Sequence, residues 1–303
     1  MLTQIALTVL ERQSLSNASE VIVIPDCNAD VISDLVQHHG KIQGVYPVFV
    51  KKLSMKSRLA IRLARNPNMN HYAQIIEGVS TAQGEYVLLH DADLFIRPGD
   101  FLENYYDAIV SRGIDVIGVT RREWGGAQHL VATWEMMAKR DWFQRFPPFY
   151  HKGHIVNLGG RLVMFDTTLY PQHLTQRERI GLYESAVDVE FVHFHYVISI
   201  YRRYAQVRKL QDPKFYTQLL LIRLLLDAYE IHDSSAIVPG VEDYVASWEG
   251  ESLVIPRRFF DDRERYYTFR DKVRKLLSFG ILPEHASRRI AENMALIDQC
   301  FGL

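Results

Sequence analysis

Two carboxylates, Asp91 and Asp93, stand one residue apart in the stretch GEYVLLHDADLFIRPGDF, which covers residues 84–101. Four apolar residues, at positions 86 to 89, predict a buried strand, so both carboxylates belong to the turn that follows it. Mg²⁺ and Mn²⁺ prefer oxygen ligands, and two carboxylates at this spacing can reach one ion directly and through water. The pattern therefore favours a divalent-cation site. A solvated turn with a helix-capping aspartate is the structural alternative.

An ion at this turn would have a definite chemical use. Mg²⁺ in proteins is usually held by one or two carboxylates together with the phosphates of a substrate. Such an ion neutralises the diphosphate of a bound nucleotide and so favours its departure as a leaving group. The acidic turn therefore leads to the hypothesis of chemistry on a nucleotide diphosphate, with Mn²⁺ or Mg²⁺ as the cofactor.

The elements around the turn alternate between strands and helices. Their alternation implies an α/β fold with a mostly parallel sheet that helices cover on both faces. Ligands bind such sheets at the carboxyl ends of the strands, where Asp26, Asp91 and Asp93 all fall. Apolar runs predict strands at residues 20–25, 45–50, 85–89 and 115–120. Helical spacing predicts helices at residues 2–12, 30–39 and 98–113, and residues 58–79 are helical in parts, with an interruption at NPNMN.

The later part of the chain is less regular. Residues 125–150 contain Trp134, Trp142 and several Gly and Pro residues, which predicts a functional loop region. A tryptophan there either stacks on a sugar or packs against the sheet. Further strands are expected at residues 161–166 and 187–200, the second with His193 and His195 on one face. We expect an α/β domain over residues 1–201 and a helical C-terminal extension over residues 202–303.

Composition excludes several classes of protein. The 303 residues carry a formal net charge of −1, so no global field attracts nucleic acid. The two cysteines form no disulfide framework, and no signal peptide is visible. The most apolar run, LLLIRLLLDAY, is too short and too charged to span a bilayer. We expect a cytoplasmic protein, with peripheral contact at the inner face of the membrane left open.

Two blocks of the sequence resemble family 2 glycosyltransferases of the GT-A fold. The first, LTVLERQSLSNASEVIVIPDCNAD, is similar to that family's segment from the first helix to the second strand. The second, ARNPNMNHYAQIIEGVSTAQGEYVLLHDADLFIRPGDFLE, resembles the next block, where a Gly-Glu-Tyr strand leads into the metal-binding Asp-x-Asp. The resemblance covers residues 2–120 well and residues 121–200 loosely. It implies transfer of a sugar from a UDP- or GDP-linked donor to a saccharide or glycoconjugate acceptor, in polysaccharide or glycoconjugate assembly.

The resemblance also implies roles for individual residues. Asp26 stands where the family's strand-end Asp contacts the nucleobase. Asn70, Asp91 and Asp93 complete the residues expected to bind the nucleotide sugar. In some GT-A enzymes a later histidine completes the metal site; a packed core histidine is the alternative. The metal ligands implied here are Asp91, Asp93 and either His193 or His195.

The catalytic base is assigned less sharply. An inverting transferase needs a carboxylate that takes the proton of the acceptor hydroxyl while the anomeric carbon is attacked. The acidic pair that serves this role in the family has no clear counterpart here. The candidates are Glu178, Glu184 and Asp188, and spacing favours the first two. An exposed surface charge is the alternative for each, and a retaining mechanism without such a base stays open.

The beginning of the chain departs from the family pattern. The family's opening strand should precede the first helix, yet Met1 stands at that helix. We expect the strand to be encoded upstream, because losing a central strand would leave many backbone groups unpaired. If the strand is lost, the second hypothesis is a degenerate, non-catalytic GT-A-like binding or scaffold module. Metal-dependent phosphohydrolases fit less well, because their motifs sit on helices or near the chain start.

Overall fold

The computed structural model divides the chain into two compact units, and each is described by itself. Unit 1 comprises Met1–Val9, Ala92–Pro98 and Phe191–Leu303, and unit 2 comprises Leu10–Asp91 and Gly99–Glu190. The expected domain boundary at residue 201 falls outside the described residues and stays a prediction. The structure describes residues 2–18, 20–25, 40–64, 68–124, 127–183, 190–197, 200, 216–229, 244–248, 251–255 and 262–300.

The sheet of unit 2 confirms the expected α/β class. Its strands lie in the order β12 (Ile180–Leu182), β6 (Val116–Gly118), β9 (Glu135–Lys139) and β4 (Tyr86–His90). Strands β4, β6 and β12 run in one direction, because β6 pairs parallel with β12 and both β4 and β6 pair antiparallel with β9. Three of the four strands are therefore parallel in direction, and the one reversed strand lies between two of them.

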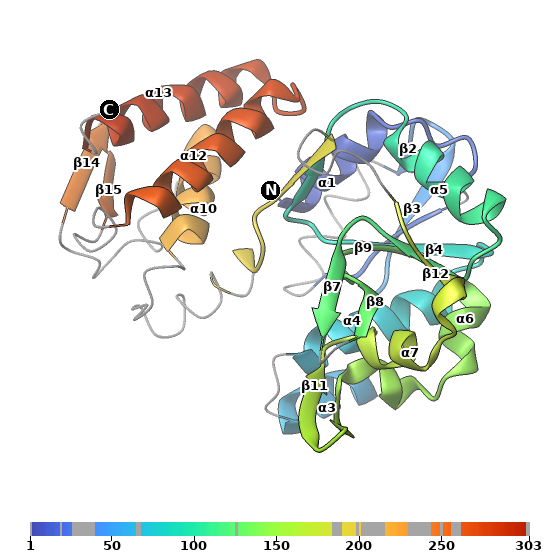
Figure 1. The fold of residues 1–303 in the computed structure, drawn as a ribbon. Helices are drawn as coiled ribbons and strands as arrows, with labels where there is room; N and C mark the ends of the chain where they lie inside the picture. The colour runs from blue at the N-terminus through green and yellow to red at the C-terminus, as the bar shows by residue number, and fades with distance from the viewer. Residues whose placement is uncertain are drawn as a thin grey trace. The chain divides into compact units, whose positions relative to one another are not determined.

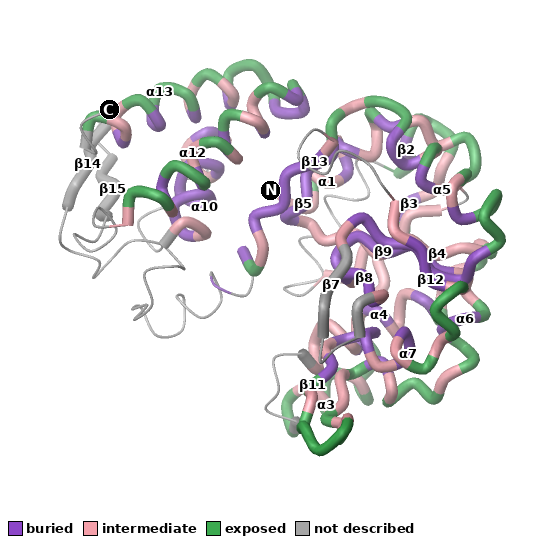
Figure 2. The backbone as a smooth tube through the Cα atoms, viewed as in Figure 1, coloured by how far each residue is buried: buried purple, intermediate pink, exposed green. Residues whose placement is uncertain are grey.

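Strand β9 corrects the prediction of a loop over residues 125–150. Its first four residues are buried, and Figure 2 shows the strand buried along nearly its whole length. A hairpin precedes it, formed by β7 (Arg121–Trp124) and β8 (Ala127–Val131), and α6 (Arg140–Arg145) follows it. The sequence EMMAK lacks β-branched residues, so its strand conformation comes from pairing with β4 and β6 on both sides rather than from local preference.

Helices cover both faces of this sheet, as Figure 1 shows. On one face, Val116, Met136 and Ala138 pack against residues of α4 (Asn68–Thr81) and α6. On the other face lies α5 (Phe101–Ser111), whose buried Tyr105 donates a hydrogen bond to the carbonyl oxygen of Ile117 (2.8 Å). This hydrogen bond ties α5 to the backbone of β6, so the sheet lies between two helical layers.

Besides the β7–β8 hairpin, two smaller sheets lie among the described residues of unit 2. Strand β1 (Val21–Val23) pairs parallel with β3 (Tyr46–Val50), and β2 (Lys41–Ile42) pairs antiparallel with β3. Strands β10 (His154–Leu158) and β11 (Arg161–Phe165) form a hairpin. Its turn, Gly159–Gly160, has φ angles of 57° and 86°, a conformation that glycine adopts without strain. The other helices that the structure describes in this unit are α3 (Met55–Ala64), η1 (Pro148–Lys152), α7 (Leu169–Leu174) and η2 (Arg177–Arg179).

Unit 1 joins a short antiparallel pair to helices from the last third of the chain. Strand β5 (Leu94–Ile96) pairs with β13 (Phe191–His193), so the strand expected over residues 187–200 is much shorter than predicted. Helix α10 (Tyr216–Ala228) packs on α13 (Glu284–Cys300), where Asp227 receives a hydrogen bond from Arg289 (2.6 Å). Helix α12 (Arg263–Ser278) contacts β13, and α1 (Leu2–Glu11) begins the unit.

The described residues of the C-terminal extension are mostly helical, as expected, but they also include a hairpin. Strands β14 (Tyr244–Trp248) and β15 (Glu251–Ile255) pair antiparallel, and no sequence pattern predicted them. In the part of the chain that the structure describes, no helix combines the length and the apolarity needed to cross a bilayer.

Candidate metal centre

The acidic turn follows β4 directly, as the sequence predicted. The N–H of Asp91 donates a hydrogen bond to the carbonyl oxygen of Trp134 (3.2 Å), which fixes the point where the strand ends. Strand β5 begins at Leu94, immediately after Asp93, and its register places Leu94 opposite His193. Pairing of β5 with β13 therefore brings His193 beside Asp93, although the two residues lie 100 positions apart in the chain.

Asp93 is held by several groups at once. Its carboxylate oxygen Oδ1 lies 3.2 Å from Nε2 of His193, and its Oδ2 accepts a hydrogen bond from the N–H of Val197 (3.0 Å). The carbonyl oxygen of Asp93 accepts another from the N–H of Phe194 (3.2 Å). Asp93 is 6% exposed, so a charged carboxylate has been drawn out of water and held in a fixed position.

The backbone after β13 turns sharply to reach Asp93. His195 and Tyr196 have positive φ angles of 53° and 61°, an uncommon conformation for residues other than glycine. This turn carries Val197 back to the Asp93 carboxylate. It also takes His195 out of the strand, which corrects the prediction that His193 and His195 share a strand face. The two rings still lie in contact, with their centroids 3.7 Å apart and their planes tilted by 48°.

Burial and hydrogen bonding act in opposite directions on Asp93. Burial by itself would raise the pKa of this carboxyl group, but the hydrogen bond and charge of His193 lower it, as does the N–H of Val197. The net pKa lies below its usual value, so Asp93 carries a negative charge at neutral pH. An ionised, buried carboxylate is a suitable ligand for a cation.

Lys272, on α12, is a further cation near this carboxylate. Its Nζ donates a hydrogen bond to the carbonyl oxygen of His193 (2.9 Å), so α12 anchors the end of β13. Burial lowers the pKa of Lys272, whereas the charge of Asp93 acts to raise it. The sequence did not point to this residue, because only the packing of α12 on β13 brings it to the site.

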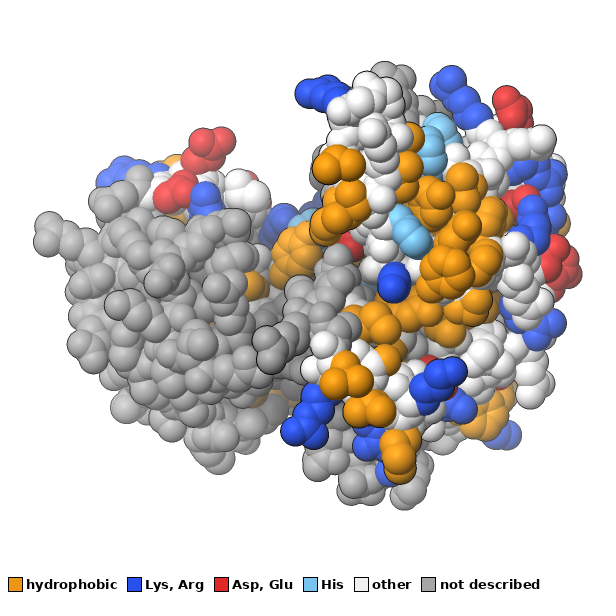
Figure 3. Space-filling model, turned by 90° about the horizontal axis from the view of Figure 1, so that it is seen from below, with side chains coloured by type: hydrophobic (Ala, Val, Ile, Leu, Met, Phe, Trp, Pro, Cys, Tyr) orange, Lys and Arg blue, Asp and Glu red, His pale blue; other side chains and the backbone are white. Residues whose placement is uncertain are grey.

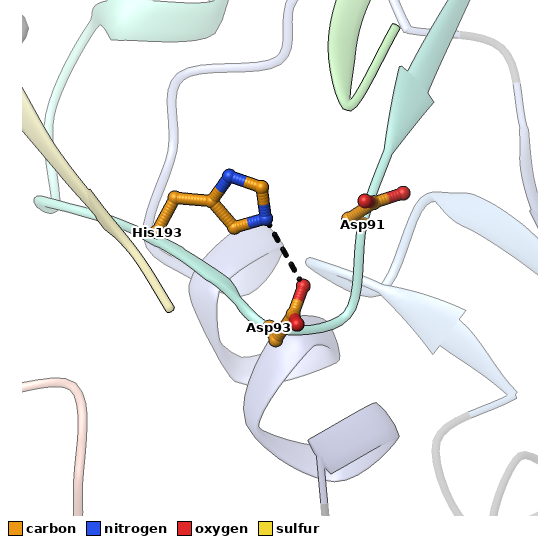
Figure 4. A group of neighbouring side chains, drawn as sticks. All are labelled: Asp91, Asp93 and His193. Atoms are coloured by element: carbon orange, nitrogen blue, oxygen red, sulfur yellow. Dashed lines mark hydrogen bonds and ion pairs between the residues drawn. The ribbon is translucent and has the colours of Figure 1, made fainter. Parts of the chain in front are cut away.

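The side chains at this turn fit a divalent cation. One oxygen each from Asp91 and Asp93 and a ring nitrogen of His193 all lie within 4.8 Å of one another, and Figure 4 shows how the three side chains lie. Neighbouring ligands in an octahedral shell with bonds of ~2.1 Å are about 3 Å apart. The 3.2 Å between Asp93 and His193 has this size. Of the two histidines that the sequence left open, His193 belongs to this group.

The surroundings of Asp91 are set by α4. Nε2 of His71 lies 3.9 Å from Oδ1 of Asp91, and Asn70 precedes His71 in the first turn of the helix. One turn further on, Gln74 donates a hydrogen bond to the carbonyl oxygen of Ile24 (2.9 Å), just after β1. The start of α4 therefore adjoins the carboxyl ends of both β1 and β4. Asp26, which was expected at the end of β1, lies outside the described residues.

A hydrogen-bonded side-chain pair lies directly behind the turn. Nδ1 of His90, the last residue of β4, lies 2.9 Å from Oε2 of Glu135, and Glu135 is fully buried. The two residues face each other across the β4–β9 ladder. This side-chain pair fixes the strand end from which Asp91 projects.

The candidate bases are not brought together with the acidic turn as far as the structure describes them. Glu178 lies in η2, which precedes β12, whereas Asp91 follows the carboxyl end of β4. Because β4 and β12 run in the same direction, Glu178 lies at the amino ends of these strands, whereas Asp91 lies at their carboxyl ends. Glu184 and Asp188 lie outside the described residues.

The tryptophans at residues 125–150 are buried rather than available for a sugar. Trp142 is 0% exposed, packs against His151, and donates a hydrogen bond to Thr175 (2.8 Å). Trp134 is 8% exposed. Packing against the sheet and its helices, the alternative considered for these residues, is what the structure has.

Three comparisons with known proteins bear on this arrangement. The sequence matches the family described as "Glycosyl transferase family 2" over residues 4–172, which is more than half of the chain. A search of curated proteins gives no match. Among solved structures, the chain is similar to the crystal structure of S. aureus TarS, with 12% sequence identity and a TM-score of 0.39. That alignment covers 99% of this chain and 51% of the TarS chain, so this chain spans about half of that length.

Proposed function

This chain belongs to glycosyl transferase family 2, and from that premise we propose that it transfers a sugar from a nucleotide-diphosphate donor to a hydroxyl group of a saccharide or glycoconjugate acceptor. The observation that carries the proposal is the convergence of Asp91, Asp93 and His193 in a single group after the strand end.

We propose that the three residues hold a divalent cation, with Mn²⁺ favoured over Mg²⁺. The set combines carboxylate oxygens with an imidazole nitrogen, whereas Mg²⁺ strongly prefers oxygen ligands and water. When bound, the cation would supply positive charge beside the diphosphate as it becomes the leaving group. His90 and Glu135 would keep the turn in place behind the ligands.

The remaining residues would bind the donor and handle the proton. Asp26 and Asn70 would bind the nucleotide part of a UDP- or GDP-linked sugar, because the start of α4 adjoins the ends of β1 and β4. In an inverting reaction, a carboxylate takes the proton of the acceptor hydroxyl, the new bond forms at the anomeric carbon, and the nucleotide diphosphate departs. Glu184 and Asp188 follow β12 closely in the chain, so we propose one of them as this base.

Thermal unfolding tests donor binding directly. We would titrate the protein with UDP-glucose, UDP-N-acetylglucosamine and GDP-mannose, each with and without Mn²⁺. A ligand that binds only the folded state at a hundred times its Kd stabilises it by about 2.7 kcal/mol. We expect at least one donor to raise the unfolding temperature, and to do so only with Mn²⁺.

Asp93→Asn is the matched variant for this titration, because it keeps the side-chain shape and removes the charge. We expect that nucleotide sugar and Mn²⁺ no longer raise the unfolding temperature of this variant. A wild-type protein that shows no metal-dependent response to any nucleotide sugar would support the non-catalytic scaffold instead. Transfer to an acceptor, followed by the anomeric configuration of the product in NMR spectra, distinguishes an inverting from a retaining reaction.

A further inference from the structure

One segment of unit 2 has a charge unlike that of the whole chain. Residues 41–76 contain seven Lys or Arg residues and no Asp or Glu, although the protein as a whole carries a net charge of −1. Helix α3 and the residues just before it hold most of this charge. In α3 and the residues just before it, the exposed cations are Lys52, Lys56, Arg58 and Arg62. A charge cluster of this kind attracts anionic surfaces.

Helix α3 turns its apolar residues outward. Met55, Leu59 and Leu63 are 82%, 56% and 72% exposed, and they follow one another at intervals of four residues, which places them in one stripe. The opposite side of the helix is fixed to α4, because Ser57 donates a hydrogen bond to Glu77 (2.8 Å). The apolar stripe therefore faces outward because the opposite side of α3 packs on α4.

The cations flank this stripe on both sides. At 100° per residue, Lys56 projects next to Leu63 on one side of the stripe, and Arg62 and Arg58 project next to Met55 on the other. An exposed apolar stripe bordered by Lys and Arg is the pattern of a helix that lies in the plane of a membrane surface.

The β10–β11 hairpin presents a second outward apolar face. Ile155 and Met164 lie opposite each other in its register, Leu162 lies on the same face, and the three are 67%, 56% and 77% exposed. The other face of the hairpin, which carries the buried Phe165, packs against Leu130 and Leu169. In Figure 1, β11 and α3 lie at the same end of unit 2. Figure 3, seen from that end, shows hydrophobic side chains gathered with Lys and Arg beside them.

We propose that this end of unit 2 is a membrane-docking surface, with α3 lying in the headgroup region of an anionic bilayer. The stripe Met55–Leu59–Leu63 would enter the boundary between headgroups and acyl chains, and Lys52, Lys56, Arg58 and Arg62 would contact lipid phosphates. The occupant is a lipid surface rather than a protein, because flexible Lys and Arg side chains around a narrow stripe match a fluid, uniformly anionic partner. The inference does not depend on the glycosyl-transfer proposal.

Vesicle flotation with the full chain tests this surface. The probes are vesicles of phosphatidylcholine alone and vesicles of phosphatidylcholine and phosphatidylglycerol in equal parts, each at low and at high salt. We expect the protein to float with the anionic vesicles at low salt and to bind less at high salt, because salt screens the attraction to the headgroups. Vesicles of phosphatidylcholine alone should bind much less protein.

Two variants separate the apolar and the charged contributions. Met55→Ser/Leu59→Ser/Leu63→Ser removes the stripe, and Lys56→Glu/Arg62→Glu reverses the charges beside it. All five side chains are exposed, so both proteins should fold, which circular dichroism and thermal unfolding check. We expect each variant to lower the vesicle partition coefficient at least about tenfold. The matched controls are Val110→Ser on α5 and Arg263→Glu/Arg274→Glu on α12, which should bind as the wild type does.

Each other result overturns the proposal. Absence of flotation with anionic vesicles rules out the lipid surface, and equal binding by the α3 variants and the controls rules out this location. Light scattering serves as a second measurement. Concentration-dependent self-association that disappears in the α3 variants, without vesicle binding, would assign the stripe to a second copy of the chain.

Discussion

Asp93 and Asp115 are both buried carboxylates, but the protein neutralises them in different ways. Asp115 is 0% exposed and precedes β6, where Arg145, Arg179 and Lys139 all contact it; Nη1 of Arg145 lies 2.9 Å from its Oδ2. Asp93 instead has His193, which is charged only when protonated, and the backbone N–H of Val197. Asp115 is therefore saturated with permanent cations, and Asp93 is not.

The difference teaches how a structural carboxylate is distinguished from a ligand. Burial would raise the pKa of Asp115, but the hydrogen bonds and charges of Arg179 and Arg145 lower it. Its charge is balanced without any external ion. Asp93 also has a lowered pKa, yet its main partner, His193, is itself a common metal ligand. A buried acid whose partner can also bind a metal is the better candidate for a metal site.

The largest effect is expected from Asp93→Asn. If Asp93 holds the cation that supports departure of the diphosphate, this change should lower the transfer rate by about a hundredfold or more. The measurement is the initial rate of nucleotide diphosphate release at saturating Mn²⁺, per folded molecule. Asp115→Asn is the matched control and should retain its rate. Equal rates for the two variants would erase the distinction between the two aspartates.

His151 extends the comparison to a buried ionisable group whose hydrogen-bond partner is neutral. Burial lowers the pKa of His151 to about 4, against the opposing effect of its hydrogen bond with the Phe143 carbonyl. The unfolded chain takes up a proton near pH 6.5, which the folded protein does not until about pH 4. Stability should therefore fall by up to about 3 kcal/mol as the pH is lowered through this window, and the loss should stop below it.

Urea unfolding at a series of pH values measures this loss, with His151→Gln as the matched variant. The glutamine amide keeps a donor for the Phe143 carbonyl and does not titrate in this range. We expect the difference in free energy of unfolding between wild type and variant to shrink steadily from pH 6.5 to pH 4. A constant difference across that window would mean that His151 is charged in the folded protein.

Asp115→Asn should lower the free energy of unfolding by less than acidification does through His151. Removing a buried partner of an ion pair costs ~3–5 kcal/mol, but Arg145 and Arg179 are 46% and 41% exposed and can return to water. We therefore expect a loss of about 2 kcal/mol at neutral pH. Because the folded-state pKa of Asp115 is lowered, its contribution is present above a pH of about 4 and disappears as the pH falls through the folded-state value.

The check on Asp115 is acid unfolding, which separates it from His151 by pH. The free-energy difference between wild type and Asp115→Asn should stay constant above about pH 5 and vanish in strong acid. A difference that persists in strong acid would show that the carboxylate acts through packing and not through its charge.

The smallest effect is expected from Lys272→Met. The change removes a hydrogen bond to the His193 carbonyl and a positive charge near Asp93, at a cost of about 1 kcal/mol without metal. A bound cation replaces that charge, so Mn²⁺ should raise the unfolding temperature of the variant more than that of the wild type. Lys272→Arg is the control that keeps the charge. If Mn²⁺ raised the unfolding temperature of all three proteins equally, Lys272 would not contribute to the charge balance at Asp93.

Local sequence patterns were sufficient to predict much of the fold. The strands before the acidic turn and after α5 were expected because continuous apolar runs have few other uses in a helix-covered sheet. Strand β9 was missed because its partners on both sides come from distant parts of the chain. The turn at His195 and Tyr196 was missed as well, since positive φ angles at these residue types leave no mark in the sequence.

The candidate site likewise contains residues that the sequence predicted and residues that only the fold brings together. Asp91 and Asp93 were expected from their spacing, and the resemblance to a known family supplied His193 as one of two choices. Which histidine joins the aspartates depends on the β5–β13 register, which a single sequence does not encode visibly. Lys272 comes from a helix in the last third of the chain, so only tertiary packing reveals it. The roles of Asp26, Asn70, Glu184 and Asp188 stay predictions.

His193 is synthesised well after Asp93, because the two residues lie 100 positions apart in the chain. A ribosome completes β4, β6, β9 and β12 before it makes β13, because β13 lies later in the sequence than the whole four-strand sheet. The nascent polypeptide can therefore fold its sheet while His193 is still untranslated. A chain cut short before β13 would lack the imidazole beside Asp93, so we expect it to bind manganese more weakly than the full chain does.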